Sequence, residues 1–117
     1  MSRPIIRRNV CCMPKARRFG PLDISTDENL RQIITVDEYE TIRLIDLEGL
    51  MQQECANQMG IARTTVQRIY NDARKKIANA LVNGIPLFIE GGQYSLCGGK
   101  KKSCRCGGCE KHRLNMK

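Results

Sequence analysis

Residues 50–76 constrain the fold of this 117-residue chain more than any other segment. Apolar side chains recur at helical spacing in its first part, and Gly60 follows as a residue that readily takes a left-handed backbone and ends a helix. After a short turn the helical spacing resumes and continues to Asn83-Gly84. We therefore predict a helix over residues 52–59, a tight turn and a long helix that starts near Arg63, which is the arrangement of a helix-turn-helix.

The apolar residues of the long helix mark its buried face. Polar and cationic residues lie on the opposite face, which we expect to be exposed. Amide and guanidinium groups near its start can bond base edges in a major groove, and threonine hydroxyls can bond phosphate oxygens or touch a thymine methyl. Cations further along the helix suit backbone phosphates. We predict that bases are read by Arg63, Thr64, Gln67 and Arg68, that phosphates are held by Arg74, Lys75 and Lys76, and that Thr65 and Asn71 add contacts.

Charge is divided unevenly along the chain. Residues 63–76 hold five cations and one acid, whereas residues 36–54 hold six acids and one cation. The net charge of +8 and a pI near 9.4 favour an acidic partner such as double-stranded DNA. The alternative is a charged helical face that is merely solvated. The cations coincide with the predicted turn and second helix, and this coincidence favours DNA binding.

Length and composition limit the other possibilities. A chain of 117 residues has room for one small domain, and without Trp its core must be largely aliphatic. No apolar run is long enough to cross a bilayer and the N-terminus lacks an apolar signal core, so we expect a cytoplasmic protein. In that compartment the seven cysteines are more typical of thiols or metal ligands than of disulfides. We expect Cys11 and Cys12 to be buried or half-buried thiols.

Residues 1–34 indicate a basic arm followed by a connector. The first 20 residues hold six cations and no acid, and their β-forming side chains predict a short strand over Arg8–Met13. Such an arm can enter a minor groove or follow phosphates, or it can be a surface strand whose charges only add solubility, and the sequence leaves both readings open. A single helical turn is expected around residues 27–31.

A first helix and a final strand complete the predicted domain. Residues Thr35–Glu38 match a capping box, which predicts a helix start, and Glu48-Gly49 would close that helix. We expect its acids to be surface and capping residues and its core stripe to comprise Tyr39, Ile42 and Ile45. Beyond the long helix, residues 85–89 indicate a short strand. A strand needs a partner for its backbone, so we expect it to pair with Arg8–Met13 as a small two-stranded sheet.

Several runs of residues resemble a known family. They are Arg3-Pro4, Phe19-Gly20-Pro21, Val36 to Leu50 (VDEYETIRLIDLEGL), Gln53-Glu54 with Ala56, Met59-Gly60-Ile61, Ala73 to Ala78 (ARKKIA) and Ile89 to Tyr94 (IEGGQY). Over residues 1–94 the chain resembles the DUF134 (UPF0251) family of small prokaryotic predicted DNA-binding proteins, and its middle is similar to the helix-turn-helix of sigma-factor region 4. The resemblance implies DNA binding in transcriptional control. Family members often carry a hydroxyl residue where this chain has Met51 and Ala62, so two N-caps worth about 1 kcal/mol each are missing.

The segment after residue 95 is rich in lysine and cysteine. Cys106 and Cys109 have the spacing of a metal chelate, and neighbouring cations favour thiolates. For zinc, Cys104 with His112 or Cys97 could complete a four-ligand shell, and for an iron-sulfur cluster the candidate ligands are Cys97, Cys104, Cys106 and Cys109. One alternative is a flexible tail without a structured site, because the segment has few apolar residues. A redox switch made from the same thiols is another.

These features predict a mainly α fold. It consists of a basic arm and connector (1–34), a three-helix, sigma region 4-like helix-turn-helix domain with a C-terminal strand (35–94) and a Cys-rich tail (95–117). The leading function is a DNA-binding transcriptional regulator that needs no cofactor to bind DNA, with a homodimer on paired half-sites as a hypothesis. The alternatives are a protein-interaction module that contacts RNA polymerase or another partner through the acidic first helix, and a metal- or redox-responsive protein. We expect no enzyme, because no nucleophile and base with a supporting acid can be identified.

Overall fold

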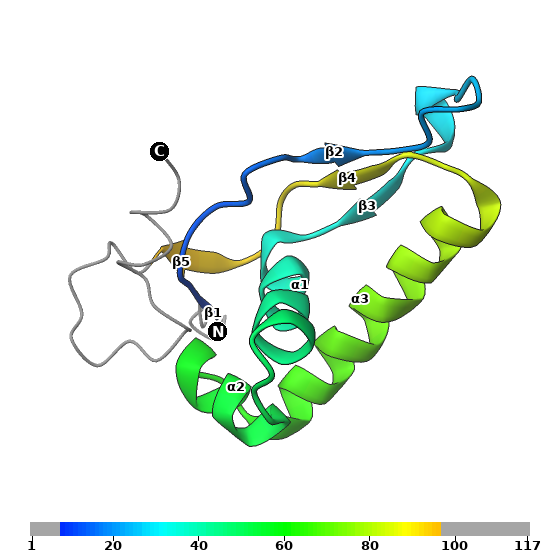
Figure 1. Ribbon diagram of the computed structural model, residues 1–117. Coiled ribbons are helices and arrows are strands. Elements are labelled where there is room, and N and C mark those ends of the chain that lie inside the picture. Colours follow the sequence, from blue (N-terminus) through cyan, green and yellow to red (C-terminus); the bar gives the residue numbers. More distant parts are fainter. Residues whose placement is uncertain (1–7, 97–117) are drawn as a thin grey trace, which may run out of the picture.

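The computed structural model describes residues 8–96 of the chain (Figure 1). The helices are α1 (Val36–Thr41), the π-helix η2 (Ile42–Leu47) that continues it, α2 (Gln52–Met59) and α3 (Arg63–Asn83). The shorter elements are β1 (Arg8–Val10), β2 (Arg18–Phe19), the 3-10 helix η1 (Glu28–Leu30), β3 (Gln32–Ile34), β4 (Leu87–Ile89) and β5 (Tyr94–Leu96). The predicted fold class, three helices with a small sheet, is confirmed, and so are the bounds predicted for α2 and the end of α3.

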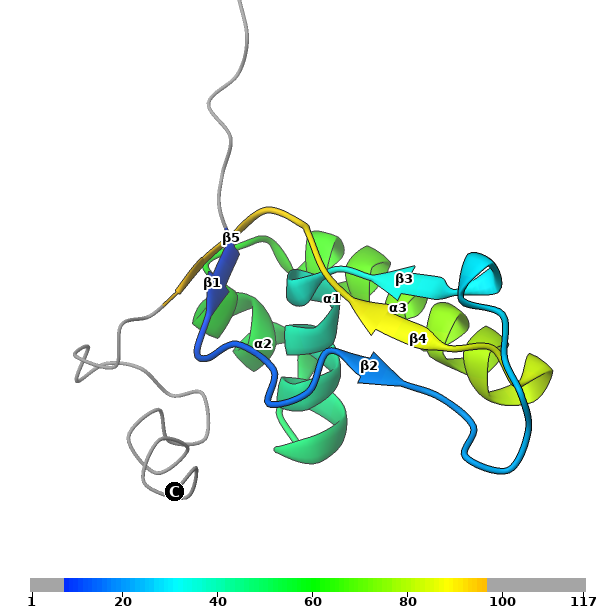
Figure 2. The same ribbon diagram turned by 90° about the horizontal axis from the view of Figure 1, so that it is seen from above.

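The strands form two small sheets, which Figure 2 shows from above. β1 pairs with β5 in parallel, and β4 lies between an antiparallel β2 and a parallel β3. Pairing of the N-terminal arm with a strand after the long helix is therefore confirmed, but the predicted partners are wrong. The strand that starts at Arg8 pairs with Tyr94–Leu96, and the strand within residues 85–89 pairs with β2 and β3. Strands of two or three residues have too few side chains to specify their partners locally.

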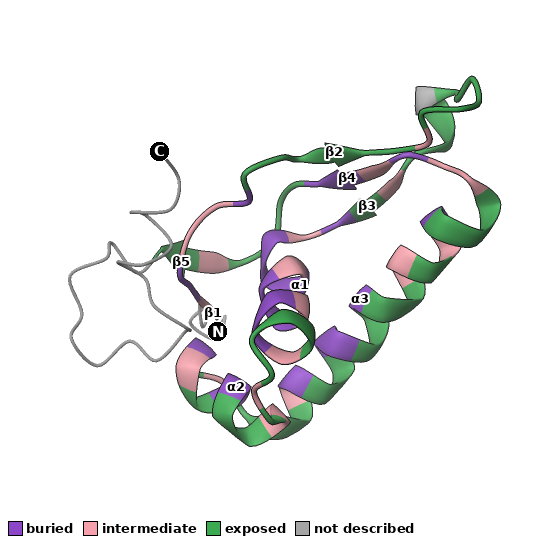
Figure 3. Ribbon diagram, viewed as in Figure 1, coloured by how far each residue is buried: buried purple, intermediate pink, exposed green. Residues whose placement is uncertain are grey.

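Two clusters of buried side chains meet at the end of β1. The cluster that we call the helical core joins the end of β1 to η2, α2 and α3, and comprises Cys11, Leu44, Cys55, Ala56, Met59 and Val66. The cluster that we call the sheet core comprises Val10, Ile34, Val36 and Ile89. Figure 3 shows that the buried residues of α3 lie on the side of the helix that faces α1. Val10 and Cys11 are adjacent in the chain and belong to different cores, so the end of β1 connects the two.

Helix α1 begins as predicted but does not bury the predicted stripe. The Thr35 hydroxyl accepts the Glu38 amide at 3.4 Å, and a Glu38 carboxylate oxygen accepts the Thr35 amide at 2.9 Å, so the capping box is confirmed. The predicted stripe of Tyr39, Ile42 and Ile45 is only half-buried, whereas Leu44 is fully buried. From Ile42 onward the reason is that η2 has π-helical hydrogen bonds between residues five apart, such as Glu48 N–H to Arg43 C=O at 2.9 Å. These wider turns rotate the faces away from a 3.6-residue period.

The acids of α1 are buried, so the prediction that the acids of the first helix lie at the surface is wrong for them. The prediction is confirmed for the capping role of Glu38 and for Asp46 and Glu48, which are exposed. The exposed fractions of Asp37, Glu38 and Glu40 are 4%, 6% and 0%. Each has a cationic partner, namely Arg8 at 2.8 Å for Asp37, Lys76 at 2.9 Å for Glu38 and Arg43 at 2.8 Å for Glu40. Two of these partners lie on β1 and α3, far away in sequence, so a helical pattern within α1 could not reveal them.

Glu40 uses both oxygens of its buried carboxylate. Oε1 accepts a hydrogen bond from Nε of Arg43 at 2.8 Å, and Oε2 accepts Nη2 of Arg43 and the backbone amide of Cys11, each at 3.0 Å. The carboxylate thus ties the chain after β1 to α1. It also acts on the helical core, because burial together with the nearby Glu40 charge raises the pKa of the Cys55 thiol to about 12.

Removal of one partner from the Glu40–Arg43 pair is the first testable change. Glu40→Ala is expected to lower the free energy of unfolding by about 3–5 kcal/mol, because it leaves a buried guanidinium and the Cys11 amide without their acceptor. Urea unfolding of Glu40→Ala, of the single variants Glu40→Leu and Arg43→Met, and of the double variant Glu40→Leu/Arg43→Met measures these losses. The double variant should lose less than the sum of the single losses, and simple additivity would contradict the assignment of a coupled buried pair.

The turn before β5 offers a matched pair of glycines. Gly91 and Gly92 both have positive φ, +77° and +99°, but a Cβ on Gly91 meets nothing within 4 Å, whereas one on Gly92 lies 2.8 Å from the Thr35 Cβ and still closer to Asp37 Oδ1. Gly91→Ala should cost about 1 kcal/mol, and Gly92→Ala about 1–3 kcal/mol more because the backbone around the capping box must shift. Thermal unfolding compares the two. Equal losses would mean that the turn does not pack against Thr35 as described.

Candidate nucleic-acid interface

A tight turn joins α2 to α3. Gly60 ends α2 with φ +71° and ψ +34°, and its amide and that of Ile61 both donate to the carbonyl of Ala56. A Cβ on Gly60 would lie 3.1 Å from the side-chain nitrogen Nδ2 of Asn9, so the turn lies close to β1. Cys55, Ala56 and Met59 bury one side of α2 in the helical core. The turn therefore presents the start of α3 from a fixed base.

Neither α2 nor α3 has a hydroxyl side chain at its N-cap position, where the chain has Met51 and Ala62. At α2, a carboxylate oxygen of Glu54 accepts the backbone amide of Met51 at 2.9 Å, which supplies half of a capping box. At α3, Ala62 has an extended backbone and its side chain makes no capping hydrogen bond, although its carbonyl accepts the Val66 amide at 3.1 Å. The first amides of α3 therefore have no side-chain cap and are free to meet an anion.

The outward face of α3 carries most of the predicted DNA-binding residues. At about 100° per residue they span an arc of roughly 140° around the helix. Seven of them are exposed, namely Arg63, Thr64, Gln67, Arg68, Asn71, Arg74 and Lys75. Asp72 is the single acid within α3, and it lies at the edge of this arc. The opposite side buries Val66, Ile69, Tyr70, Ala73 and Ala80.

The two remaining predicted residues lie at the border of that face. Lys76 is half-buried, and its ammonium binds both carboxylate oxygens of Glu38 at 2.9 and 3.0 Å, so it serves as a link from α3 to α1. Thr65 is half-buried beside the turn. Thr65 is still placed where it can bond a phosphate next to the helix start. The ammonium of Lys76 would have to leave a buried carboxylate to do so.

Arg74 is positioned by a neighbour on its own helix. Its guanidinium carbon lies 5.2 Å from the centroid of the Tyr70 ring. The Tyr70 hydroxyl in turn donates to Asp46 Oδ1 at 2.6 Å, and this hydrogen bond to a carboxylate raises the pKa of Tyr70. A guanidinium over an aromatic ring keeps its N–H groups at the ring edge, where they are available to a phosphate.

The N-terminal arm adds a cation that the sequence did not single out. A hollow of about 590 Å³ beside the turn is lined by residues that include Arg8, Asn57 and Thr65. Arg8 is paired with Asp37 at 2.8 Å and is placed there by the pairing of β1 with β5. The basic composition of the arm was visible in the sequence. No local pattern distinguished Arg8 from the other cations, because its position depends on a strand more than 80 residues away.

Comparisons with known proteins identify the family. A family model described as "Protein of unknown function DUF134" matches residues 1–97. The chain belongs to this family. A UPF0251 protein of Desulfitobacterium hafniense (strain DSM 10664 / DCB-2) is 57% identical over 116 residues, which are 99% of this chain and 92% of the relative. UPF0251 proteins of Caldicellulosiruptor bescii and Moorella thermoacetica are 48% and 46% identical, each over 92% of this chain and over 74% and 72% of the relatives. No solved structure gives a significant match.

The cysteines of this DUF134 member divide into two groups. Cys11 is buried, Cys12 is half-buried, and their sulfurs lie 3.7 Å apart, so the prediction for this pair is confirmed. Among residues 8–96, no group of three or more His, Cys, Asp or Glu side chains is placed to hold a metal ion. The predicted ligands Cys97, Cys104, Cys106, Cys109 and His112 lie outside the described residues. The described helices include none that is both long and apolar enough to span a bilayer.

Proposed function

We propose that this protein binds double-stranded DNA through the outward face of α3 and acts in transcriptional control. The observation that carries the proposal is the exposure of four cations and three neutral hydrogen-bonding side chains on one face of a helix that follows a tight turn. A helical face that only contacts solvent would be equally soluble with acids and cations mixed. Here the sole acid, Asp72, lies at the edge.

The dimensions of α3 fit a major groove. The segment from Arg63 to Lys75 rises about 18 Å, and a helix with its side chains is about 10–12 Å wide, close to the width of the groove. In the proposed complex Arg63, Gln67 and Arg68 bond base edges, with Thr64 and Asn71 beside them. Arg74 and Lys75 hold phosphates further along.

The turn would meet the DNA backbone. The uncapped amides at the start of α3 and the Thr65 hydroxyl lie around the hollow beside the turn, and amides at a helix start are a common phosphate site. Arg8 lines the same hollow and is held there by its ion pair with Asp37, so the basic arm lies close to the helix start. This arrangement does not need the arm to enter a minor groove.

The alternative of a protein-interaction module rested on an acidic outer surface of the first helix. Asp37, Glu38 and Glu40 are buried in internal ion pairs, and this removes most of that surface. The acids that stay exposed in this region are Asp46, Glu48 and Glu54. DNA is therefore the partner that the charge distribution favours.

Salt dependence is the first test of the proposal. If the four exposed cations of α3 each neutralise about one phosphate, the affinity for a random duplex should fall roughly a hundredfold between about 50 and 200 mM salt. Fluorescence anisotropy with the full chain, purified without oxygen, measures the slope. The stoichiometry on one duplex also shows whether one or two copies bind. A protein that does not bind even at low salt would overturn the proposal.

The division of α3 into base-reading and phosphate-holding residues is tested by three neighbouring changes. Arg68→Ala should lower the free energy of binding by about 1–3 kcal/mol on a site selected from random duplexes, and by less on random DNA. Lys75→Ala should weaken binding to both and lower the salt slope by about one.

The adjacent Lys76→Ala is the matched control for Lys75. It should lower the midpoint of thermal unfolding, because Glu38 loses its partner, and leave the salt slope unchanged. Anisotropy and unfolding on the same preparations separate the two effects. Equal losses for Arg68→Ala and Lys75→Ala on both duplexes would contradict the assigned roles.

A further inference from the structure

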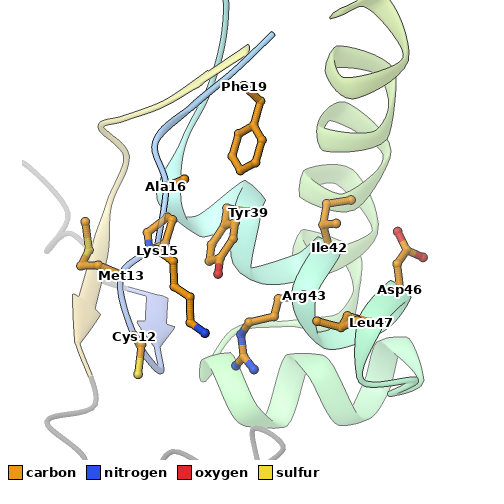
Figure 4. Close-up of a pocket in the computed structure, with 11 residues that line it drawn as sticks. Cys12, Met13, Lys15, Ala16, Phe19, Tyr39, Ile42, Arg43, Asp46 and Leu47 are labelled. Atoms are coloured by element: carbon orange, nitrogen blue, oxygen red, sulfur yellow. The ribbon is translucent and has the colours of Figure 1, made fainter. Parts of the chain in front are cut away.

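A hollow of about 700 Å³ lies between the segment that joins β1 to β2 and the rod formed by α1 and η2 (Figure 4). Its volume is in the range of pockets that hold small molecules, and its walls are mainly apolar. Phe19, Tyr39, Ile42 and Leu47 are among the lining residues, and none of the lining residues belongs to α3. DNA contacts along α3 therefore do not account for this hollow.

Two large apolar side chains of the hollow remain in water. Phe19 is 52% exposed and Leu47 is 74% exposed. Within the described residues nothing covers them, although each could bury a large apolar area. A flat apolar or aromatic molecule that lay between them would gain free energy in proportion to the area that it removes from water.

One cation of the hollow has no counter-ion within the part of the chain that the structure describes. Lys15 is exposed and forms no ion pair with any residue in the range 8–96, whereas the charge of Arg43 is balanced by Glu40 and Glu48. Figure 4 shows Lys15 and Arg43 both reaching toward the same end of the hollow. An anionic group on a bound molecule would supply the missing partner for Lys15.

The wall on the side of α1 is built from the π-helix. Ile42, Arg43, Asp46 and Leu47 all belong to η2 and all line the hollow. π-helical turns are rare and occur frequently at functional sites. The two unusual features of this part of the fold, the hollow and the π-helix, are therefore in the same place.

A short chain of contacts connects this wall to the outward face of α3. Asp46 accepts the hydrogen bond of the Tyr70 hydroxyl at 2.6 Å, and the Tyr70 ring lies under the guanidinium of Arg74. A molecule that displaced Asp46 or moved η2 would change the support of Arg74. Arg74 is one of the two cations assigned to phosphate.

We propose that the hollow is an effector site for a flat apolar or aromatic molecule with one anionic group, and that its occupant acts on α3 through Asp46 and Tyr70. The first half concerns binding alone. The second half rests on the proposed DNA-binding function.

Two fluorescent probes of matched shape test the ligand class. 8-Anilinonaphthalene-1-sulfonate is an aromatic anion, and N-phenyl-1-naphthylamine is its neutral counterpart. The full-length folded protein should bind one equivalent of the anion with saturation. Lys15→Gln should weaken the anion about fivefold and leave the neutral probe unchanged. Leu47→Asn should weaken both probes about tenfold.

Leu81→Asn is the matched control for Leu47→Asn. Leu81 is 81% exposed at the far end of α3, outside the hollow, and its replacement should change neither affinity. If Leu81→Asn weakens the probes and Leu47→Asn does not, or if binding never saturates, the site is overturned. Thermal unfolding of each variant shows whether the protein under test is folded.

The coupling is tested separately from the site. Saturation with the anionic probe should change the affinity for a duplex at least threefold, and Tyr70→Phe, which keeps the ring under Arg74 but removes the hydroxyl, should abolish the change. An unchanged duplex affinity in the saturated native protein would overturn the coupling. A protein that binds the probe but no DNA would refute the proposed function and leave the site standing, and one that binds DNA but no probe would do the reverse.

Discussion

The buried carboxylate of Glu40 is the interaction on which the rest of the structure depends. An ionised group with an exposed fraction of zero is stable only if its oxygens are bonded, and here Arg43 and the Cys11 amide meet that requirement. Because the amide comes from the end of β1 and the guanidinium from η2, the pair fixes where the arm crosses the helices. The helical core and the hollow under the β1–β2 segment both lie beside this crossing.

Internal pairing of the α1 acids also shapes the outer electrostatics. Arg8, Arg43 and Lys76 neutralise Asp37, Glu40 and Glu38 inside the fold, so the charges of α1 contribute little to the field outside. The exposed cations of α3 have no such partners among the described residues apart from the Arg74 contact with Tyr70. The outward face of α3 thus keeps its cations without acidic partners among the described residues, while the three acids of α1 serve packing.

Much of the helical part of the fold could be predicted, because its signals are local. The Thr35 capping box, the glycines at 60 and 84 and the apolar period between them are each contained within a few residues. The burial of Glu40, the partners of the strands and the position of Arg8 depend on contacts between residues far apart. The buried face of η2 was also predicted wrongly, because the prediction assumed 3.6 residues per turn and η2 is π-helical. Seven of the nine residues predicted to contact DNA are exposed, whereas the ammonium of Lys76 is paired with Glu38.

Helix α3 connects the parts of the molecule that the two proposals concern. Three side-chain links hold its inner side, from Tyr70 to Asp46 on η2, from Lys76 to Glu38 on α1 and from Asn79 to Gln32 on β3. Because Tyr70, Lys76 and Asn79 lie on different turns of α3, a shift of η2, α1 or β3 would each act on its own turn of the helix. The Tyr70 link is the one nearest the proposed base-reading residues, and its acceptor belongs to a π-helix that lines a hollow. A ligand at that hollow would therefore act on the reading end of α3, while the links to α1 and β3 hold the far end in place.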